Sequence, residues 1–302
     1  MGLTAPTVAI IGPGRVGTAM GILAARHGYS VAAVGGRRPE AVRQAAAMIE
    51  GHPETYTIPA AAAQAQLVLL TVSDDAIGTV AAELADSYAL RQGAVVVHLS
   101  GALSSKIISH LHHLGCHVAS AHPMQTFSNV ESAIQNLEGC YWFCEGDSEA
   151  REMMGGLIAA LSGHVVDIAT DRKVDYHVAA VFACNYLVVL MDVALLMAER
   201  AGIDRKTAWA AFSPMVDLTL SNIGVMGARA ALSGPIRRGD RDTIARHLAA
   251  LQNQDDLIGD MYQVLGRWAA NLCRDEGYLD EDLAQRIVAQ LSTDVTDPNP
   301  GA

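Results

Sequence analysis

Short apolar runs alternate with amphipathic stretches through the first half of the chain. From residue 7 to about residue 168 the apolar runs are TVAII, SVAAV, LVLLTV, AVVVHLS, HVASAHP, CYWFCE and HVVDIA, with segments of helical period between them. This alternation is typical of strands that are linked by helices. It predicts parallel strands in a doubly wound α/β sheet, whose two faces are covered by helices.

The period changes after HVVDIA. Strand-like runs stop there, and residues 171–293 are helical in period, with expected breaks at Gly202, Pro214, Gly224, the SGPIRRGD loop and Gly277. At 302 residues the chain is long enough for two domains with a large buried core. We therefore expect an α/β domain over residues 1–169 and an all-helical domain over residues 170–302.

The stretch from residue 178 to residue 202 is apolar around most of its circumference, as a membrane span is. Asn185 and Asp192 interrupt it, and an unpaired acid at mid-bilayer costs about 2.5–3.5 kcal/mol. The two polar residues are seven apart, so they share one stripe of the helix and can pair with each other or with a partner helix. We expect a buried central helix and no membrane span.

Composition narrows the classes of function. The formal net charge of -11 disfavours a general surface for nucleic acid or for an anionic membrane, so any phosphate site has to be local. Five irregularly spaced cysteines lack the paired pattern of a structural zinc site. The segment HLHHLGCH gathers five potential metal ligands: His110, His112, His113, Cys116 and His117. Their spacing matches no defined metal site, so we expect no metal there. Without an N-terminal basic segment and long apolar run, a cytoplasmic protein is expected.

A glycine loop follows the first predicted strand. The segment GPGRVG fits G-x-G-x-x-G and leads into a helical pattern, in the order of strand, turn and helix that a dinucleotide site requires. Gly12 permits the tight turn, Gly14 the close approach of a pyrophosphate, and Gly17 the packing of helix on strand. The residues between them complete the expected cofactor site: Pro13, Arg15 and Val16. The alternative is a loop whose glycines only turn the chain.

The second predicted strand ends in two arginines and carries no acid. NAD-binding domains place Asp or Glu about 20 residues after the glycines, whereas NADP binders accommodate the 2′-phosphate with arginine. In VAAVGGRRPE the guanidinium of Arg37 or Arg38 can pair bidentately with a phosphate. This pattern predicts NADP(H) as the cofactor. The alternative is a pair of solvated charges at the start of a helix.

Further candidates follow three other strands, at the edge where open parallel sheets bind ligands. They come from TVSDD, HLSGALSS and AHPMQTF: Val72, Ser73, Asp74, Ser100, Gly101, His122 and Gln125. The TVSDD residues border the cofactor, and Ser100 serves both the cofactor and a substrate carboxylate near a helix start. Gly101 and Gln125 are candidate substrate contacts. His122 is a donor to a substrate oxygen, or else a packed histidine that holds a loop.

The helical half of the chain opens with DRKVDYH. Lys173 and His177 are four residues apart and so share one helical face. Reduction of a carbonyl needs a proton donor and a second polar group that fixes the substrate, which predicts Lys173 as the acid with His177 beside it. The alternative is a solvated helix start with surface ion pairs. Asn185 is a candidate substrate contact, and the loop LSGPIRRGD offers Arg237 and Arg238 to an anion.

Together these motifs resemble the superfamily of 6-phosphogluconate dehydrogenase-like enzymes, which includes 3-hydroxyacid dehydrogenases, ketopantoate reductases, pyrroline-5-carboxylate reductases and prephenate dehydrogenases. More narrowly, HLSGALSS, AHPMQTF, KVDYHVAAVFACNYL and LSGPIRRGD look like the Rossmann-like proteins with a C-terminal domain of unknown function, some of which are connected with ketopantoate reduction. The resemblance covers nearly the whole chain. It implies an N-terminal Rossmann domain and an all-helical 6-phosphogluconate dehydrogenase C-terminal-like domain.

The resemblance also carries expectations about the site and the assembly. In the hydroxyacid and ketopantoate enzymes an asparagine that holds the substrate follows the lysine by four residues, and here that position is His177. The substrate geometry is therefore expected to differ. The long helix of these families commonly lies in a dimer interface, which implies a homodimer through residues 178–202.

These inferences combine into one hypothesis. The chain is expected to be an NADPH-dependent oxidoreductase that reduces a small anionic carbonyl compound in the cleft between its domains, with a 2-oxo acid such as ketopantoate as the leading substrate. Lys173 supplies the proton, while Ser100 and His122 hold the acid group. One alternative is another hydroxyacid dehydrogenase or an imine reductase of the same superfamily. An alternative of a different class is a sensor that binds NADP(H) without chemistry.

Overall fold

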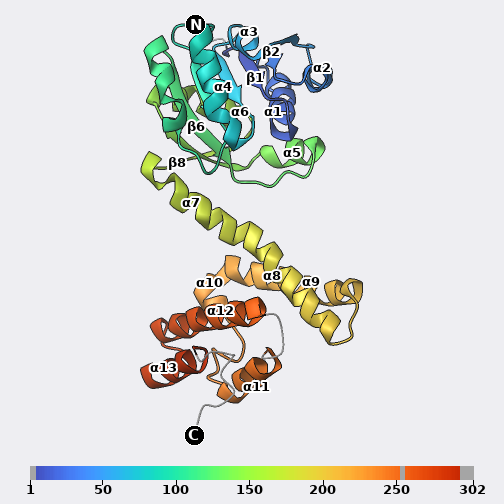
Figure 1. The fold of residues 1–302 in the computed structure, drawn as a ribbon, viewed down its shortest axis with the longest axis vertical. Helices are drawn as coiled ribbons and strands as arrows, with labels where there is room; N and C mark the ends of the chain where they lie inside the picture. Colours follow the sequence, from blue (N-terminus) through green and yellow to red (C-terminus); the bar gives the residue numbers. More distant parts are fainter. Residues whose placement is uncertain (1–4, 252–255, 293–302) are drawn as a thin grey trace. The chain divides into compact units, whose positions relative to one another are not determined.

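The computed structural model describes residues 5–251 and 256–292. The chain forms two compact units, which divide between Asn185 and Tyr186. The first unit holds an eight-stranded sheet, and the described residues of the second are helical (Figure 1). The last strand ends at Asp167, near the predicted boundary at residue 169, whereas the first compact unit continues through α7 (Lys173–Ala180), whose side chains bond to the strand ends.

The sheet has the strand order β3-β2-β1-β4-β5-β6-β7-β8, that of a doubly wound sheet with additional strands at one edge. Its strands are Val8–Ile11 (β1), Val31–Gly35 (β2), Glu54–Tyr56 (β3), Leu67–Leu70 (β4), Val95–His98 (β5), His117–Pro123 (β6), Tyr141–Gly146 (β7) and His164–Asp167 (β8). All neighbours pair in parallel except β6 and β7, which are antiparallel. The carboxyl ends of β1, β2, β4, β5 and β6 therefore meet at one edge.

Two features of the sheet correct the prediction from sequence. The edge strand β3 has no counterpart among the apolar runs, because it is only three residues long, Glu-Thr-Tyr, and mostly polar. The run CYWFCE, predicted as a parallel strand, forms β7 and runs antiparallel to β6. An apolar run indicates that a strand is buried, but it does not indicate the direction of that strand. The direction depends on how the connecting segment returns to the sheet.

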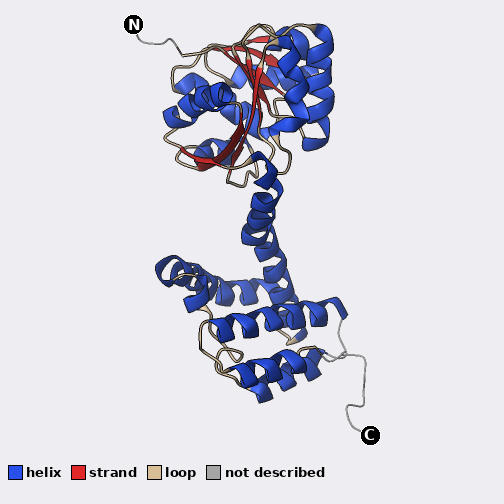
Figure 2. Ribbon diagram, turned by 90° about the vertical axis from the view of Figure 1, so that its left-hand side faces the viewer, coloured by secondary structure: helices blue, strands red, loops and turns tan. Residues whose placement is uncertain are grey.

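Helices cover both faces of the sheet (Figure 2). On one face lie α1 (Arg15–Arg26), α2 (Pro39–Met48), α5 (Val130–Leu137) and α6 (Ser148–Ala160), and on the other lie α3 (Ile58–Ala62), α4 (Asp74–Ser87) and the 3₁₀ helix η1 (Ser105–Leu114). Alternate strand residues supply the two cores: Val95 and Val97 of β5 pack in one, and Val96 packs in the other. The doubly wound α/β architecture is as predicted.

The second unit contains α8 (Tyr186–Arg200), α9 (Arg205–Met226), α10 (Ala228–Ala231), α11 (Arg241–Leu251), α12 (Asp256–Asp275) and α13 (Glu281–Gln290). The expected breaks at Gly202, at the SGPIRRGD loop and at Gly277 lie between these helices. The breaks expected at Pro214 and Gly224 are wrong, because α9 runs through both. A proline removes one backbone hydrogen bond and a glycine only lowers helix propensity, which a helix of 22 residues tolerates.

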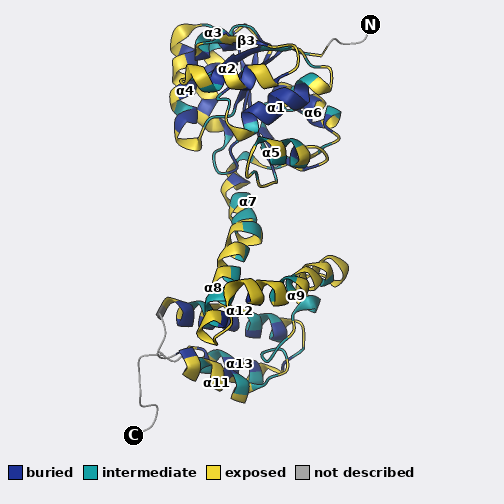
Figure 3. Cartoon of the chain, turned by 90° about the vertical axis from the view of Figure 1, so that its right-hand side faces the viewer, coloured by how far each residue is buried: buried dark blue, intermediate teal, exposed yellow. Residues whose placement is uncertain are grey.

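The apolar stretch predicted as a buried central helix belongs to a helical segment from Thr170 to Arg200, which includes the π-helix η3 (Val181–Asn185). Within the described part of the chain, most of this segment is exposed or only partly buried (Figure 3). Val178, Phe182 and Val188 expose 48%, 64% and 66% of their surface. By length and composition alone the segment could cross a membrane. The sequence pattern indicates that the apolar surface of this helix is buried, but it does not indicate which molecule buries it.

Candidate functional site

A cavity of about 430 Å³ lies at the carboxyl ends of β1, β2 and β4. It is lined by the glycine loop, by the residues after β2 and β4 and by two helices: Gly12, Pro13, Gly14, Gly36, Arg37, Arg38, Ala41, Ile58, Thr71, Val72 and Ser73. This is the crevice at the switch of strand order, where open α/β sheets bind their ligands. The structure thus brings the glycine loop and the arginine pair of the sequence prediction to one cavity.

The three glycines of the loop have different surroundings. Gly12 has φ +91°, and a Cβ atom there would lie 2.4 Å from Cγ1 of Val72. A Cβ on Gly17 would lie 2.2 Å from Oγ1 of Thr71, so helix α1 packs closely on the sheet. At Gly14, by contrast, a Cβ would meet no atom within 4 Å. The absence of a side chain at Gly14 therefore serves no internal packing and keeps the cavity open for a ligand.

Arg37 and Arg38 are exposed at the cavity. Within residues 5–251 and 256–292, neither guanidinium has a hydrogen bond or an ion pair. The nearby acid Glu40 is paired with Arg43. No acidic residue is among those that line the cavity. The cavity therefore presents two uncompensated cations, which suits an anion such as a phosphate.

Five predicted cofactor residues lie outside the cavity lining: Arg15, Val16, Gly17, Asp74 and Ser100. Arg15 donates hydrogen bonds to the carbonyl oxygens of Phe127 and Ser128, at 2.9 and 3.1 Å. Val16 packs against the core beneath α1. Asp74 is exposed at the first turn of α4. The structure gives the first two a structural use: Arg15 ties the loop that follows β6 to the glycine loop.

A second polar cluster lies on the next strands of the same edge. Of eight buried polar residues in the part of the chain that the structure describes, six gather here: His98, Ser100, Ser105, Ser120, Glu145 and Lys173. The Lys173 ammonium donates to Oγ of Ser120 at 2.5 Å, and Ser120 donates to the carbonyl oxygen of Ser100 at 3.3 Å. Both oxygens of Glu145 accept hydrogen bonds from Ser105.

Burial dominates the electrostatics of this cluster. It lowers the pKa of Lys173 to about 8, against the opposing influence of Glu145, then of Cys144 and Asp74. Burial, and secondarily the charge of Lys173, also lowers the pKa of His98 to about 4. Near pH 7 the cluster therefore holds a protonated lysine that can release its proton one pH unit above neutrality, beside a neutral histidine.

The side chains of His122 and His177 flank Gly101. A Cβ atom on Gly101 would lie 2.8 Å from both Cε1 of His122 and Nδ1 of His177. The hydroxyl of Tyr176 is 2.5 Å from Nδ1 of His122. Burial, followed by the charges of Lys173 and His177, lowers the pKa of His122 to about 4. His122 is therefore neutral near pH 7, and if the Tyr176 hydroxyl donates to Nδ1, its Nε2 carries the N–H.

The predicted face of the long helix is thus brought to the strand ends. Lys173 reaches Ser120 on β6, while the Nδ1 atom of His177 is buried beside Gly101. Lys173, which the sequence predicts as the acid, is almost fully enclosed, because it is only 1% exposed. Sequence spacing identifies a shared helical face but does not measure how deeply it is enclosed.

Other candidates have local partners. Oγ of Ser100 accepts from the amides of Ala102 and Leu103, so it holds the turn after β5. Arg237 donates from Nη1 to two carbonyl oxygens and lies over the ring of Tyr278 at 3.9 Å, so its guanidinium braces its own loop. Asp192 pairs with Arg205 and not with Asn185. Gln125 and Asn185 are exposed.

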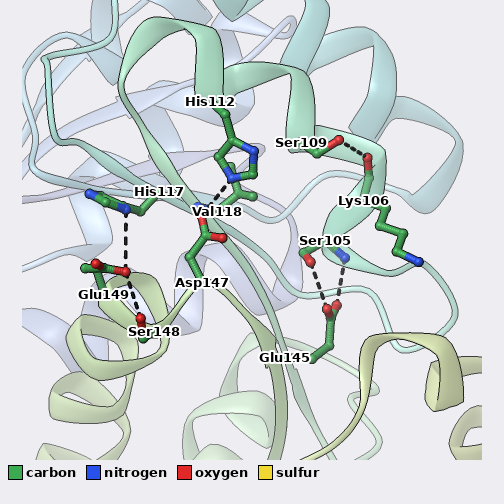
Figure 4. A network of polar contacts seen from close by, with 10 residues as sticks. All are labelled: Ser105, Lys106, Ser109, His112, His117, Val118, Glu145, Asp147, Ser148 and Glu149. Atoms are coloured by element: carbon green, nitrogen blue, oxygen red, sulfur yellow. Dashed lines mark hydrogen bonds and ion pairs between the residues drawn. The ribbon is translucent and has the colours of Figure 1, made fainter.

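The histidine cluster of HLHHLGCH forms separate surface contacts. His112 pairs with Asp147 at 2.8 Å, and His117 lies 3.7 Å from Glu149 (Figure 4). Among the described residues, no group of three or more potential ligands converges on a metal position. His112 and His117 therefore fasten η1 and β6 to Asp147, which precedes α6, and to Glu149 in the first turn of α6.

Several residues of the two sites escaped the sequence prediction, among them Thr71, Ser105, Ser120, Glu145 and Tyr176. Thr71 donates to the carbonyl oxygen of Gly12 at 2.7 Å and lines the cavity. Ser120 and Tyr176 are neighbours in sequence of the predicted His122 and His177, so their positions were available signals. Glu145 had none, because it belongs to a strand whose direction the apolar pattern did not reveal.

Comparison with known families matches two models to the chain. Residues 4–123 match a Rossmann-like domain, and residues 140–269 match the domain of unknown function DUF2520. A comparison with curated proteins finds no match. These matches agree with the α/β fold and the helical half that the sequence predicts.

Solved structures share the fold over most of the chain. A provisionally assigned NADP oxidoreductase from Bacteroides fragilis is 23% identical, with a TM-score of 0.69 over 87% of this chain and 97% of that chain. Protein TM1727 from Thermotoga maritima is 22% identical, with a TM-score of 0.63 over 94% and 98%. An imine reductase from Myxococcus stipitatus, solved with NADP⁺, is 14% identical, with a TM-score of 0.58 over 95% and 93%.

Proposed function

We propose that this chain, which joins a Rossmann-like domain to a DUF2520 domain, is an NADPH-dependent reductase of small carbonyl compounds. The observation that carries the proposal is the arginine pair at the cavity of the glycine loop, which has no partner among the residues that the structure describes. Arg37 and Arg38 bind the 2′-phosphate, and the open position at Gly14 admits the pyrophosphate. The names of two structural neighbours, an NADP oxidoreductase and an imine reductase solved with NADP⁺, support this cofactor.

The polar cluster is the catalytic half of the proposal. The cavity lies on β2, β1 and β4, and the cluster lies on β5, β6 and β7, the next strands of the same sheet. Strands are about 4.8 Å apart, so a dinucleotide seated at β1 extends its nicotinamide end toward β5 and β6. When bound, NADPH would supply a hydride to the substrate carbonyl carbon.

The residues of the chain handle the proton. Lys173 is the proton source, because its pKa of about 8 keeps it charged at neutral pH yet makes it a stronger acid than an ordinary lysine. On reduction Lys173 gives its proton to the substrate oxygen and is left as the neutral amine, while His122 holds the same oxygen: His122 is neutral and, with the Tyr176 hydroxyl donating to its Nδ1, donates a hydrogen bond from Nε2. His177, beside Gly101, fixes the substrate in the position that asparagine has in the related families.

A 2-oxo acid is the first substrate candidate, with ketopantoate as the leading example. The ammonium of Lys173 favours an acid group nearby, and a substrate carbonyl beside it would accept the His122 N–H. A cyclic imine is the second candidate, because a solved imine reductase shares the fold over 95% of this chain. In that case protonation by Lys173 would activate the C=N bond before reduction.

We also propose a cytoplasmic homodimer in which the helix exposed in one chain is covered by its counterpart. Exposed apolar residues recur every four positions along it, at Val174, Val178, Phe182 and Tyr186. A contiguous apolar face of this kind is typical of a protein interface. Burial against a second copy explains the apolar circumference without a membrane.

The test is a titration of the purified protein with NADPH and with NADH, followed by addition of 2-oxo acids and cyclic imines while absorbance of the reduced nicotinamide is recorded. We expect tighter binding of NADPH and its consumption with one substrate class. Binding without consumption across both panels would favour the non-catalytic sensor. Equal affinity for both nucleotides would remove the role given to Arg37 and Arg38.

A further inference from the structure

Glu145 is a buried carboxylate that the proposed reaction does not use. Its side chain stands on β7 and is 1% exposed. Burying an ionised group costs several kcal/mol unless nearby charges and hydrogen bonds compensate. The negative charge of Glu145 should therefore be offset by nearby hydrogen-bond donors and positive charge, and the structure provides them on two sides.

One side is η1, which anchors the carboxylate. The amide nitrogen and the hydroxyl of Ser105 each donate to Glu145, both at 2.7 Å (Figure 4). Ser105 is the first residue of η1, where the unpaired amides of a helix favour negative charge. Two donors on two different oxygens fix the orientation of the carboxylate.

The other side is Lys173, which the strand register brings to Glu145. Ser120 of β6 is the direct partner of Glu145 in the antiparallel β6–β7 pair. Such partners point to the same face, with Cβ atoms about 4.5–5.5 Å apart. The ammonium of Lys173 is bound to Oγ of that same Ser120 at 2.5 Å. A buried cation and a buried anion thus occupy neighbouring positions on one face of the sheet.

We propose that Glu145 is a positioning residue whose carboxylate keeps the buried Lys173 side chain protonated and holds its ammonium at Ser120. The inference rests on the proposed function, because a proton donor in the cluster is useful only if it is charged at neutral pH. It adds a residue that acts on the reaction through Lys173 and does not itself contact the substrate.

The other ionisable groups that face Lys173 come from β5, β6, β7 and α4: His98, His122, Cys144 and Asp74. Burial lowers the pKa of both histidines to about 4 and raises the pKa of the thiol to about 12, so these three are uncharged near pH 7. The carboxylate of Asp74 is exposed, where water screens its charge. Glu145 is the buried counter-charge of the set.

The test measures the pKa of Lys173 directly. The chain has only three lysines, Lys106, Lys173 and Lys206, so protein labelled with ¹³C at lysine Cε gives few resonances, and Lys173→Arg assigns the one of interest. Titration of that resonance in the full-length protein requires neither cofactor nor substrate. We expect Glu145→Gln to lower the Lys173 pKa, because Glu145 is the first of the charges that raise it; an opposite charge about 4–6 Å away shifts a pKa by about 1–3 units.

Two variants serve as controls. Asp74→Asn removes the exposed carboxylate and is expected to move the Lys173 pKa by less than about half a unit. Glu145→Asp retains the negative charge but places it farther from Lys173. The pKa of Lys173 in this variant should therefore lie between its values in the wild type and in Glu145→Gln. If Glu145→Gln does not fold, Glu145→Asp carries the test, because it must still lower the pKa of Lys173 more than Asp74→Asn does.

The outcomes separate this inference from the proposed function. A folded Glu145→Gln variant with an unchanged Lys173 pKa would overturn the inference, whatever the activity. A lowered pKa supports it. If the pKa falls while the pH dependence of substrate reduction stays where it is, Glu145 still governs Lys173, but Lys173 is not the proton donor of the reaction.

Discussion

The sharpest prediction concerns the arginine pair. Arg37 and Arg38 line the cavity of the glycine loop and have no protein partner within the described residues, so removing them should disturb little besides an anionic ligand. We predict that Arg37→Ala and Arg38→Ala each weaken NADPH binding, and that the double variant weakens it more. NADH, which lacks the 2′-phosphate, should bind the variants as it binds the wild type.

The magnitude follows from the contacts that are available. A hydrogen bond to a charged group contributes about 1.5–3 kcal/mol, which corresponds to a roughly 10- to 150-fold change in Kd. Because both guanidinium groups are exposed, the lower end of that range applies to each single variant. The effect should shrink as salt is raised, since the Debye length falls from about 10 Å at 0.1 M to about 3 Å at 1 M.

The assay is a fluorescence or calorimetric titration with both nucleotides at low and high salt. Arg26→Ala is the matched control, because it removes a likewise exposed arginine at the end of α1, which is not part of the cavity lining. A double variant that binds NADPH as tightly as the wild type would refute the reasoning. So would an equal loss of NADH affinity, because the arginines would then not be reading the phosphate.

Three further predictions follow from the structure. Gly14→Ala should leave the free energy of unfolding unchanged, because the new Cβ meets no protein atom, but the same Cβ should block NADPH binding. Gly12→Ala should instead lower the free energy of unfolding by about 1–3 kcal/mol, because its Cβ clashes with Val72. Urea unfolding and nucleotide titration separate the two effects. With a Lys173 pKa of about 8 and the protonated form active, kcat/KM for reduction should be level below pH 8 and fall about tenfold per unit above it; a profile that rises there would contradict the assignment. Val188→Glu should convert the dimer to monomer in light scattering, while Val225→Glu, 82% exposed on α9, should not; a monomeric wild type would remove the basis of the dimer.

The candidate sites divide according to how far apart their residues are in the sequence. The glycine loop and the arginine pair were predictable, since each lies in one contiguous segment whose turn and strand chemistry is local. The prediction that Arg15 and Val16 bind the cofactor is not reflected in the cavity lining, because a motif does not specify which way its variable residues point. Lys173 and His177 were predictable as a pair from helical spacing alone.

The sequence by itself determined the alternation of strands and helices, the cofactor loop and the need for a cover over the long helix, because periodicity and turn chemistry act between near neighbours. Only the tertiary structure decided which polar residues share the cluster. His98, Ser120 and Glu145 are partners across three adjacent strands, and the antiparallel direction of β7 sets the last of these pairs. The depth at which Lys173 is enclosed was likewise beyond the sequence, since burial is a sum over elements that are distant along the chain.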